Sequence, residues 1–161
     1  MVSQAKASPR QRAAASAKAA LLLAVIVGLD QLSKHTVATS QAARDGRSVF
    51  LGVRLVQVHN HGVAFGFLSG GGAIVLVVTF AALAALLVYF ALRPRRPWLW
   101  VPTGLLVGGA IGNVIDRLAH GAVTDFIKLP LWPAFNFADM AITFGVLALL
   151  WVLEGSRDEP S

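Results

Sequence analysis

The segments GGAIGNVIDRLAHGAVTDFI (residues 108–127) and FNFADMAI (residues 135–142) decide the fold and the chemistry of this chain. Both segments are largely apolar, yet they hold six side chains that are costly to leave unpaired in hydrocarbon. These side chains are Asn113, Asp116, Arg117, Asp125, Asn136 and Asp139. Such a cluster indicates a functional site, and the rest of the chain is expected to build its surroundings.

The overall composition is that of an integral membrane protein. Of the 161 residues, 56% are hydrophobic and 14% are charged, which leaves too little polar surface for a soluble domain of this size. The formal net charge is +6, but the basic residues stand in short clusters beside apolar runs. Membrane topology explains this pattern, and no nucleic-acid partner is expected. Because the chain has no cysteine, disulfides, thiolate metal sites and cysteine nucleophiles are excluded.

The first part of the chain predicts a basic leader followed by a membrane span. Residues 1–17 are basic and lack a periodic apolar face, so we predict a disordered cytoplasmic leader. The apolar run at residues 19–29 continues as a helical pattern to about Val37. A cleaved signal peptide is the alternative, but no small-x-small cleavage site closes the run. Asp30 and Lys34, spaced i, i+4, either pair inside the bundle or form a terminal pair that reaches toward the interface.

Residues 38–72 are polar enough to leave the membrane, and we expect them to form an extracytoplasmic cover element. Residues 48–59 are rich in β-branched residues and alternate in part, which predicts a strand or a small sheet. A turn is expected at residues 60–62, followed by a short interfacial helix at residues 63–68.

Three further apolar runs predict membrane spans. They cover residues 73–92, 98–120 and 132–154. Each can cross a hydrocarbon core about 30 Å thick. Four spans place both termini on one side, and the basic loop at residues 93–97 assigns that side to the cytoplasm. The expected fold class is an all-α membrane protein with four transmembrane helices, a small extracytoplasmic β-sheet and an interfacial helix. Residues 18–154 form its single domain, and residues 155–161 form a cytoplasmic tail.

The third span combines a packing face with a polar end. Its glycine stripe comprises Gly104, Gly108 and Gly112. Small residues every four positions allow another helix to approach closely. Asn113, Asp116, Arg117 and His120 follow at helical spacings and share a broad face. Taken alone, Asp116 and Arg117 are well explained by an ion pair at the interface, and His120 by an interface residue.

Two aspartates lie in and just after the link between the third and fourth spans. Asp125 is expected in a loop and Asp139 near the start of the fourth span. If the loop folds back, the two carboxylates meet and share one proton, so one can activate water while the other protonates the substrate. A proton or ion relay in a small transporter uses buried aspartates equally well. A third alternative is a non-catalytic lipid-binding scaffold, which would tolerate substitution of both aspartates.

Other chemistries lack their signatures in this sequence. There is no metal-ligand spacing, no glycine-rich phosphate loop and no nucleophilic serine motif. We therefore expect neither a metal nor a cofactor.

Five blocks resemble those of the lipoprotein signal peptidase family, the type II signal peptidases. The blocks are DQLSK (30–34), NHGVAFGF (60–67), GGAIGNVIDR (108–117), VTDFI (123–127) and FNFADMAI (135–142). The resemblance implies a monomeric intramembrane aspartic endopeptidase of the bacterial cytoplasmic membrane, with its active site at the outer face and membrane lipids around it. Its substrates would be diacylglyceryl-modified prolipoproteins, cut just before the lipidated Cys.

The resemblance also implies roles for individual residues. Asp125 and Asp139 match the catalytic pair. The positions that shape or line the substrate site are Asn60, Gly62, Gly109, Asn113, Arg117, Val123, Asn136 and Ala138. The polar positions tied to the integrity of the site are Asp30, Lys34 and Asp116.

Overall fold

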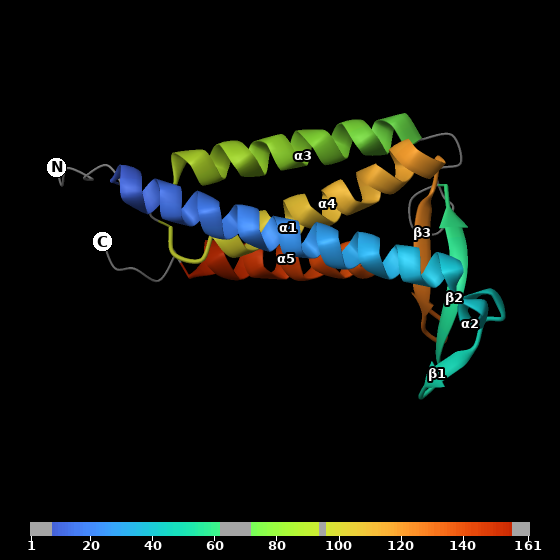
Figure 1. Cartoon of the computed structure of the whole chain (residues 1–161). Coiled ribbons are helices and arrows are strands. Elements are labelled where there is room, and N and C mark those ends of the chain that lie inside the picture. Colours follow the sequence, from blue (N-terminus) through green and yellow to red (C-terminus); the bar gives the residue numbers. More distant parts are fainter. Residues whose placement is uncertain (1–7, 62–71, 94–95, 156–161) are drawn as a thin grey trace.

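The computed structural model describes residues 8–61, 72–93 and 96–155. Its long helices are α1 (Pro9–Thr39), α3 (Gly72–Leu92), α4 (Trp100–His120) and α5 (Phe137–Glu154). These helices form an elongated bundle, and a small sheet lies across one end of it (Figure 1). The first turn of α1 and the last turn of α5 lie at the other end.

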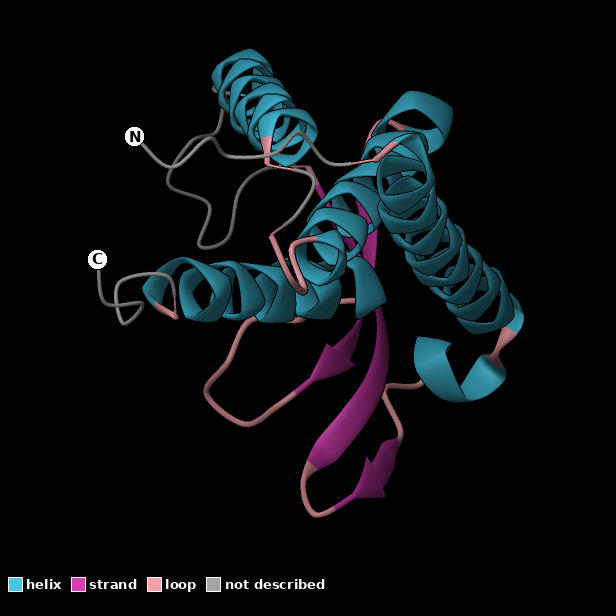
Figure 2. Ribbon diagram, turned by 90° about the vertical axis from the view of Figure 1, so that its left-hand side faces the viewer, coloured by secondary structure: helices cyan, strands magenta, loops and turns pink. Residues whose placement is uncertain are grey.

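The sheet has three antiparallel strands in the order β1–β2–β3. The strands are β1 (Ser48–Phe50), β2 (Val53–Asn60) and β3 (Val123–Lys128). β2 pairs with β3 from Asn60 opposite Val123 at one end to Arg54 opposite Lys128 at the other. The short helix α2 (Gln41–Arg44) connects α1 to the sheet. The strands run across the axis of the bundle, and the end that carries β1 projects beyond its side (Figure 2).

Helix α4 is the helix that α1, α3 and α5 all contact. A Cβ added at Gly104 would lie 2.9 Å from the Cβ of Leu22 in α1, and one at Gly108 would lie 3.0 Å from the Cβ of Ile26. A side chain at Gly104 would clash with α1, and one at Gly108 would push Ile26 aside, so the two glycines allow this close approach. The predicted glycine stripe is thus confirmed as the face that receives α1.

A small apolar core joins the sheet to the bundle. Phe126 of β3 packs with Val37 of α1 and Ala43 of α2, and Leu55 and Ile127 lie against this cluster. This cluster anchors β3 to the end of α1 and to α2.

Helix α1 begins at Pro9, which corrects the predicted disorder of residues 9–17. Ser8 is the N-cap, because its hydroxyl accepts a hydrogen bond from the backbone N–H of Gln11 while the Gln11 side chain accepts one from the N–H of Ser8. A capping box followed by proline is a typical helix start. The helix then continues to Thr39, which confirms the predicted first helix.

Strands β1 and β2 confirm the predicted β segment at residues 48–59. The expected interfacial helix at residues 63–68, and Gly62 in the turn before it, lie outside the described residues.

Two expectations about the segment before the last helix are wrong. Asp125 lies on strand β3 and not in a loop, and the last helix begins at Phe137 and not at Trp132. The reason is a backbone bridge, since the N–H and C=O of Phe135 both bond to Ile127. This bridge keeps the chain extended until Asn136 caps α5.

Among the described residues, α1 and α5 are long and apolar enough to cross a membrane, and α3 contains a shorter apolar stretch at Phe80–Leu92. Large apolar side chains on the bundle face outward, among them Leu21 of α1 and Trp151 of α5. Such an exposed apolar surface is expected where lipid is the solvent.

Candidate active site

Asp125 is a buried carboxylate on β3, with 2% of its surface exposed. Its Oδ2 accepts a hydrogen bond from Nδ2 of Asn60 on β2 at 3.0 Å, and its Oδ1 accepts one from Nδ2 of Asn136 at 2.8 Å. Burial raises the pKa of Asp125 from 3.8 to about 6, while the amide of Asn60 opposes this rise and the carboxylate of Asp139 adds to it. The group therefore titrates within reach of neutral pH.

Asp139 lies in the first turn of α5, where the helix cap orients its carboxylate. Its Oδ2 accepts a hydrogen bond from the backbone N–H of Asn136 at 3.2 Å, and its own N–H donates to Oδ1 of Asn136 at 2.9 Å. The two bonds form a capping box. Its Oδ1 accepts a further bond from Nδ2 of Asn113 on α4 at 2.9 Å.

Asn136 bonds to both aspartates. Its side chain is fully buried, and its Nδ2 donates to Asp125 while its Oδ1 accepts from the N–H of Asp139. Its Nδ2 also lies 3.1 Å from Oδ1 of Asn113 and 3.4 Å from the carbonyl oxygen of Thr124. Asn136 therefore reaches the carboxylate of Asp125 through its side chain and that of Asp139 through its backbone N–H.

Asn113 connects this pair to a buried cation. Its Oδ1 accepts hydrogen bonds from Nζ of Lys34 at 3.2 Å and from Asn136, while its Nδ2 donates to Asp139. A flipped amide would turn its NH₂ group toward the ammonium of Lys34. Lys34 therefore fixes the orientation in which Asn113 donates to Asp139.

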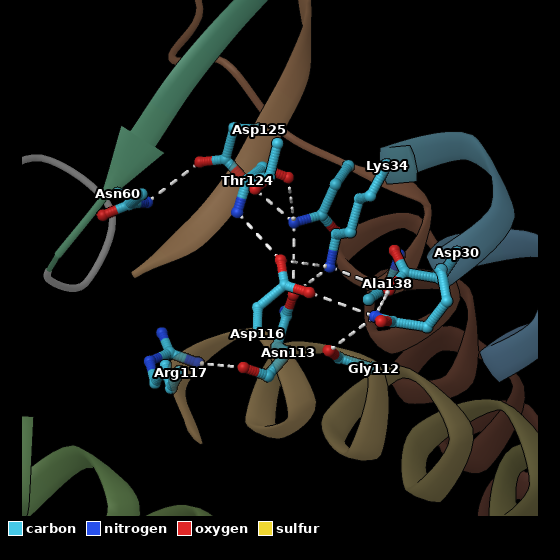
Figure 3. A network of polar contacts seen from close by, with 12 residues as sticks. Asp30, Lys34, Asn60, Gly112, Asn113, Asp116, Arg117, Thr124, Asp125 and Ala138 are labelled. Atoms are coloured by element: carbon cyan, nitrogen blue, oxygen red, sulfur yellow. Dashed lines mark hydrogen bonds and ion pairs between the residues drawn. The ribbon is translucent and has the colours of Figure 1, made fainter. Parts of the chain in front are cut away.

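Lys34 is the centre of a buried cluster of charges (Figure 3). Its Nζ lies 2.8 Å from Oδ2 of Asp30 and 3.0 Å from Oδ2 of Asp116. Backbone donors complete the cluster, since Asp30 accepts from the N–H of Ala138 at 3.0 Å and Asp116 accepts from that of Thr124 at 2.9 Å. The cluster thus ties α1 and α4 to β3 and to the start of α5. Of the two alternatives for Asp30 and Lys34, pairing inside the bundle is confirmed.

The expected ion pair between Asp116 and Arg117 is wrong, because Asp116 pairs with Lys34. Neighbouring residues on a helix do not face each other. Arg117 is half-buried and donates to the carbonyl oxygen of Asn113 at 3.3 Å, so it lies beside the site on another face of α4. His120 is exposed at the end of the same helix.

Three of the predicted site positions are close-packed. A Cβ added at Gly109 would lie 2.5 Å from the carbonyl oxygen of Ala138, which itself is fully buried. Val123 is also buried, at the start of β3. Gly109 thus allows α4 to lie close to the start of α5.

Gln31 and Thr124 belong to the network but were not predicted. Nε2 of Gln31 donates to the carbonyl oxygen of Gly112 at 3.2 Å and to Oδ1 of Asp116 at 3.1 Å. The backbone N–H of Thr124 donates to Asp116, and its carbonyl oxygen accepts from Asn136. The available signal was their position inside the DQLSK and VTDFI blocks. Polarity alone does not separate them from surface residues. In the described ranges, no three His, Cys, Asp or Glu side chains form a metal-binding group.

Comparison with known proteins decides the family. A family model described as signal peptidase (SPase) II matches residues 22–154. The chain belongs to the signal peptidase II family. Lipoprotein signal peptidases from Moorella thermoacetica and Xanthomonas campestris pv. campestris are 45% and 44% identical to it over 136 and 150 residues. These alignments cover 83% and 85% of this chain and 91% and 89% of the relatives.

Solved structures extend the comparison to the fold of this signal peptidase II family member. Two structures, each described as a bacterial membrane enzyme structure, match with TM-scores of 0.74 and 0.71 at 30% and 33% identity. They cover 89% and 84% of this chain, and the matches span 92% and 91% of those chains. The protein is therefore a signal peptidase located in a membrane, and the transporter or proton-relay alternative has no support.

Proposed function

We propose that this protein is an aspartic endopeptidase that removes the signal peptide from diacylglyceryl-modified bacterial prolipoproteins, cutting just before the lipidated Cys. Asp125 and Asp139 are the proposed catalytic pair. The observation that carries this assignment is the buried Asn136, which hydrogen-bonds to both carboxylates. The relatives named as lipoprotein signal peptidases support the substrate class.

The proposed mechanism needs one proton on the pair. The ionised carboxyl takes a proton from a water molecule, whose oxygen attacks the scissile carbonyl carbon, while the protonated carboxyl donates to the carbonyl oxygen. Collapse of the tetrahedral intermediate then returns a proton to the leaving amine. The raised pKa of Asp125, caused mainly by burial, supports this scheme because it favours the protonated form of that carboxyl more than exposure to water would.

The residues around the pair have separate roles: the amides orient the two carboxylates, and Arg117 contacts the substrate. In this proposal Asn113 and Asn136 stay bonded to the carboxylates, and Arg117, half-buried beside them, contacts a polar group of the substrate. Asn60 approaches Asp125 from the sheet side. A lipid-modified peptide can then enter laterally between sheet and helices, where water and acyl chains coexist.

We also propose that all four long helices cross the cytoplasmic membrane of a bacterium as one monomeric domain, with the sheet outside. The end of the bundle opposite the sheet supports this topology. Trp98 and Trp100 stack there with ring centroids 6.3 Å apart, and Nζ of Lys18 lies 5.8 Å from the ring centroid of Trp100. Aromatic and basic residues gather in this way at the cytoplasmic interface. Both termini are then cytoplasmic.

Cleavage by purified protein tests the proposal. A diacylglyceryl-modified prolipoprotein is presented in detergent micelles to the wild type and to Asp125→Asn, Asp139→Asn and the control Asp45→Asn, an exposed aspartate at the end of α2. We expect cleavage by the wild type and the control, and a loss of at least about 100-fold in each site variant. Full activity in a folded Asp125 or Asp139 variant would refute the assignment of the pair.

A further inference from the structure

The end of the sheet farthest from Asp125 carries an exposed apolar surface that the proposed chemistry does not use. We call this surface the apolar tip. It consists of Val49, Phe50, Leu51, Leu131 and Trp132. Phe50 and Leu51 are 69% and 83% exposed, and Leu131 is fully exposed. Large side chains exposed together in this way mark an interaction surface.

The two most exposed leucines of the tip occupy strained backbone positions. Leu51 has φ 44° and Leu131 has φ 60°, in the left-handed region that favours glycine or asparagine. Each turn would be less strained with one of those residues. The presence of leucine at both turns indicates that the side chain itself is used.

The two turns lie together and have cations beside them. A Cβ added at Gly52 would lie 3.2 Å from Cγ of Pro130, so the β1–β2 turn contacts the segment that follows β3. Arg54 and Lys128 are register partners next to these turns. Arg54 donates through Nε to the carbonyl oxygen of Gly46 at 3.0 Å, and Lys128 donates through Nζ to that of Trp132 at 2.7 Å. These bonds hold both cations near the tip.

The position of the tip relative to the bundle suggests its partner. The strands run across the bundle axis, and the β1 end projects past the side of the helices in both views (Figures 1 and 2). If the bundle spans the membrane as proposed above, the tip lies above the lipid next to it. Apolar side chains bordered by Lys and Arg fit a lipid interface, because they meet acyl chains and phosphates respectively.

We propose that the apolar tip inserts into the outer leaflet beside the bundle. Leu51 and Leu131 enter the acyl region, while Arg54 and Lys128 meet lipid phosphates. The sheet is then fixed at both ends, by Asn60 and Asp125 at the site and by lipid at the tip. This arrangement holds β2 and β3 at a constant height above the membrane, at the level where the scissile bond of a lipid-modified peptide lies.

Because the chain has no cysteine, one introduced cysteine can report the depth of the tip. Leu51→Cys and, as a second position, Leu131→Cys are labelled with an environment-sensitive dye in the full-length protein. The protein is placed in lipid nanodiscs that contain phosphatidylglycerol, one copy per disc. Asp45→Cys at the end of α2 is the matched exposed control. Iodide quenches labels in water, and nitroxides attached to acyl chains quench labels in lipid.

We expect the labels at 51 and 131 to be quenched several-fold more by the nitroxides than the label at 45, and several-fold less by iodide. Arg54→Gln should reduce nitroxide quenching at 51 when anionic lipid is present and change it little in phosphatidylcholine alone. Iodide quenching at 51 and 131 equal to that at 45 overturns the proposal. Protection that appears only in discs with two copies also overturns it, since a second copy is then the partner.

A label at Leu147→Cys separates this proposal from the topology on which it rests. Leu147 is an exposed residue of α5, in the middle of its proposed span. Nitroxide quenching at 147 without quenching at 51 refutes the tip insertion and leaves the four-span topology intact. If neither label is quenched by nitroxide, both proposals fail.

Discussion

The two ends of strands β2 and β3 belong to one sheet but have opposite surroundings. At the site end, Asn60 and Asp125 are joined by a 3.0 Å hydrogen bond, and Asp125 is buried against the helices. At the tip end, Arg54 and Lys128 are register partners beside exposed leucines. The difference shows that the sheet buries a polar side chain where the helices lie against it and exposes large apolar side chains, beside two cations, where it extends past the side of the helices (Figure 1).

The largest expected effect comes from removing Lys34, the buried cation of α1 that lies beside the site end of the sheet. Lys34→Met leaves Asp30 and Asp116 as buried carboxylates without a counter-ion, which costs about 3–5 kcal/mol of stability. Lys128→Met at the tip end is the matched control, with an expected change of about 0.5 kcal/mol or less. Thermal unfolding in detergent measures both. Equal effects of the two variants would show that the site end is no more tightly coupled than the tip.

A pH effect of about 3 kcal/mol is expected from Asp125, at about 1.4 kcal/mol for each pH unit. Its pKa is raised from 3.8 to about 6, so the folded state binds a proton that the unfolded state has lost. The contribution of this carboxyl to stability is fully present below pH 3.8 and is lost as pH rises through about 6. Asp125→Asn should therefore gain stability relative to the wild type across this window. Unfolding curves of both proteins, with Asp45→Asn as control, measure the difference, and parallel curves would contradict it.

The variant Asn136→Ala, which lacks the side chain that bonds to Asp125, should lower cleavage activity about 100-fold. Misplacement of reacting groups by about 1 Å has effects of this size. Asn136→Ala removes the side-chain bonds to Asp125 and to the N–H of Asp139. It also removes a helix cap, so Ser8→Ala, which removes the cap of α1, is the matched control. Each cap contributes about 1 kcal/mol to stability. We expect both variants to lose that stability but only Asn136→Ala to lose activity. A kcat equal to that of Ser8→Ala would exclude the bridging role.

The smallest effect is expected at the tip. Gly52 has φ 82°, where an alanine side chain is strained, so Gly52→Ala should cost about 1 kcal/mol locally. Because the site end is held by its own contacts, cleavage of a detergent-solubilised substrate should not change. Hydrogen exchange of the β1–β2 turn measures the local effect, and a cleavage assay measures the remote one. Reduced cleavage in detergent would show that the two ends are coupled through the strands.

The site residues were predictable because polar side chains are conspicuous in an apolar sequence. Asp125, Asp139, Asn113 and Asn136 could be named from that contrast and from the matching blocks. Their partners could not be named, because the contacts join distant parts of the chain. Asn60 and Asp125 are 65 positions apart. The sequence suggested Arg117 as the partner of Asp116 because the two are adjacent, which on a helix turns them away from each other.

The helices of the fold were predictable from apolar length, but the starts of α1 and α5 were not. The predicted leader ended at Ala17, but helix α1 starts eight residues earlier, at Pro9. A capping box at Ser8 starts the helix there, although this segment has no apolar face. Helix α5 starts late because a distant segment holds Phe135 extended. Strand β3 is six residues long, too short to recognise before its partner β2 is in place.

The capping box of α5 has a consequence for how the enzyme's activity should be interpreted. One carboxylate of the proposed catalytic pair accepts the hydrogen bond that closes the first turn of a helix. A molecule whose α5 has unwound by a single turn at Asn136 would keep most of the helix and lose the orientation of the Asp139 carboxylate that the proposed mechanism needs. The temperature at which cleavage stops should therefore report the unfolding of that turn. It should lie below the temperature at which the bundle unfolds.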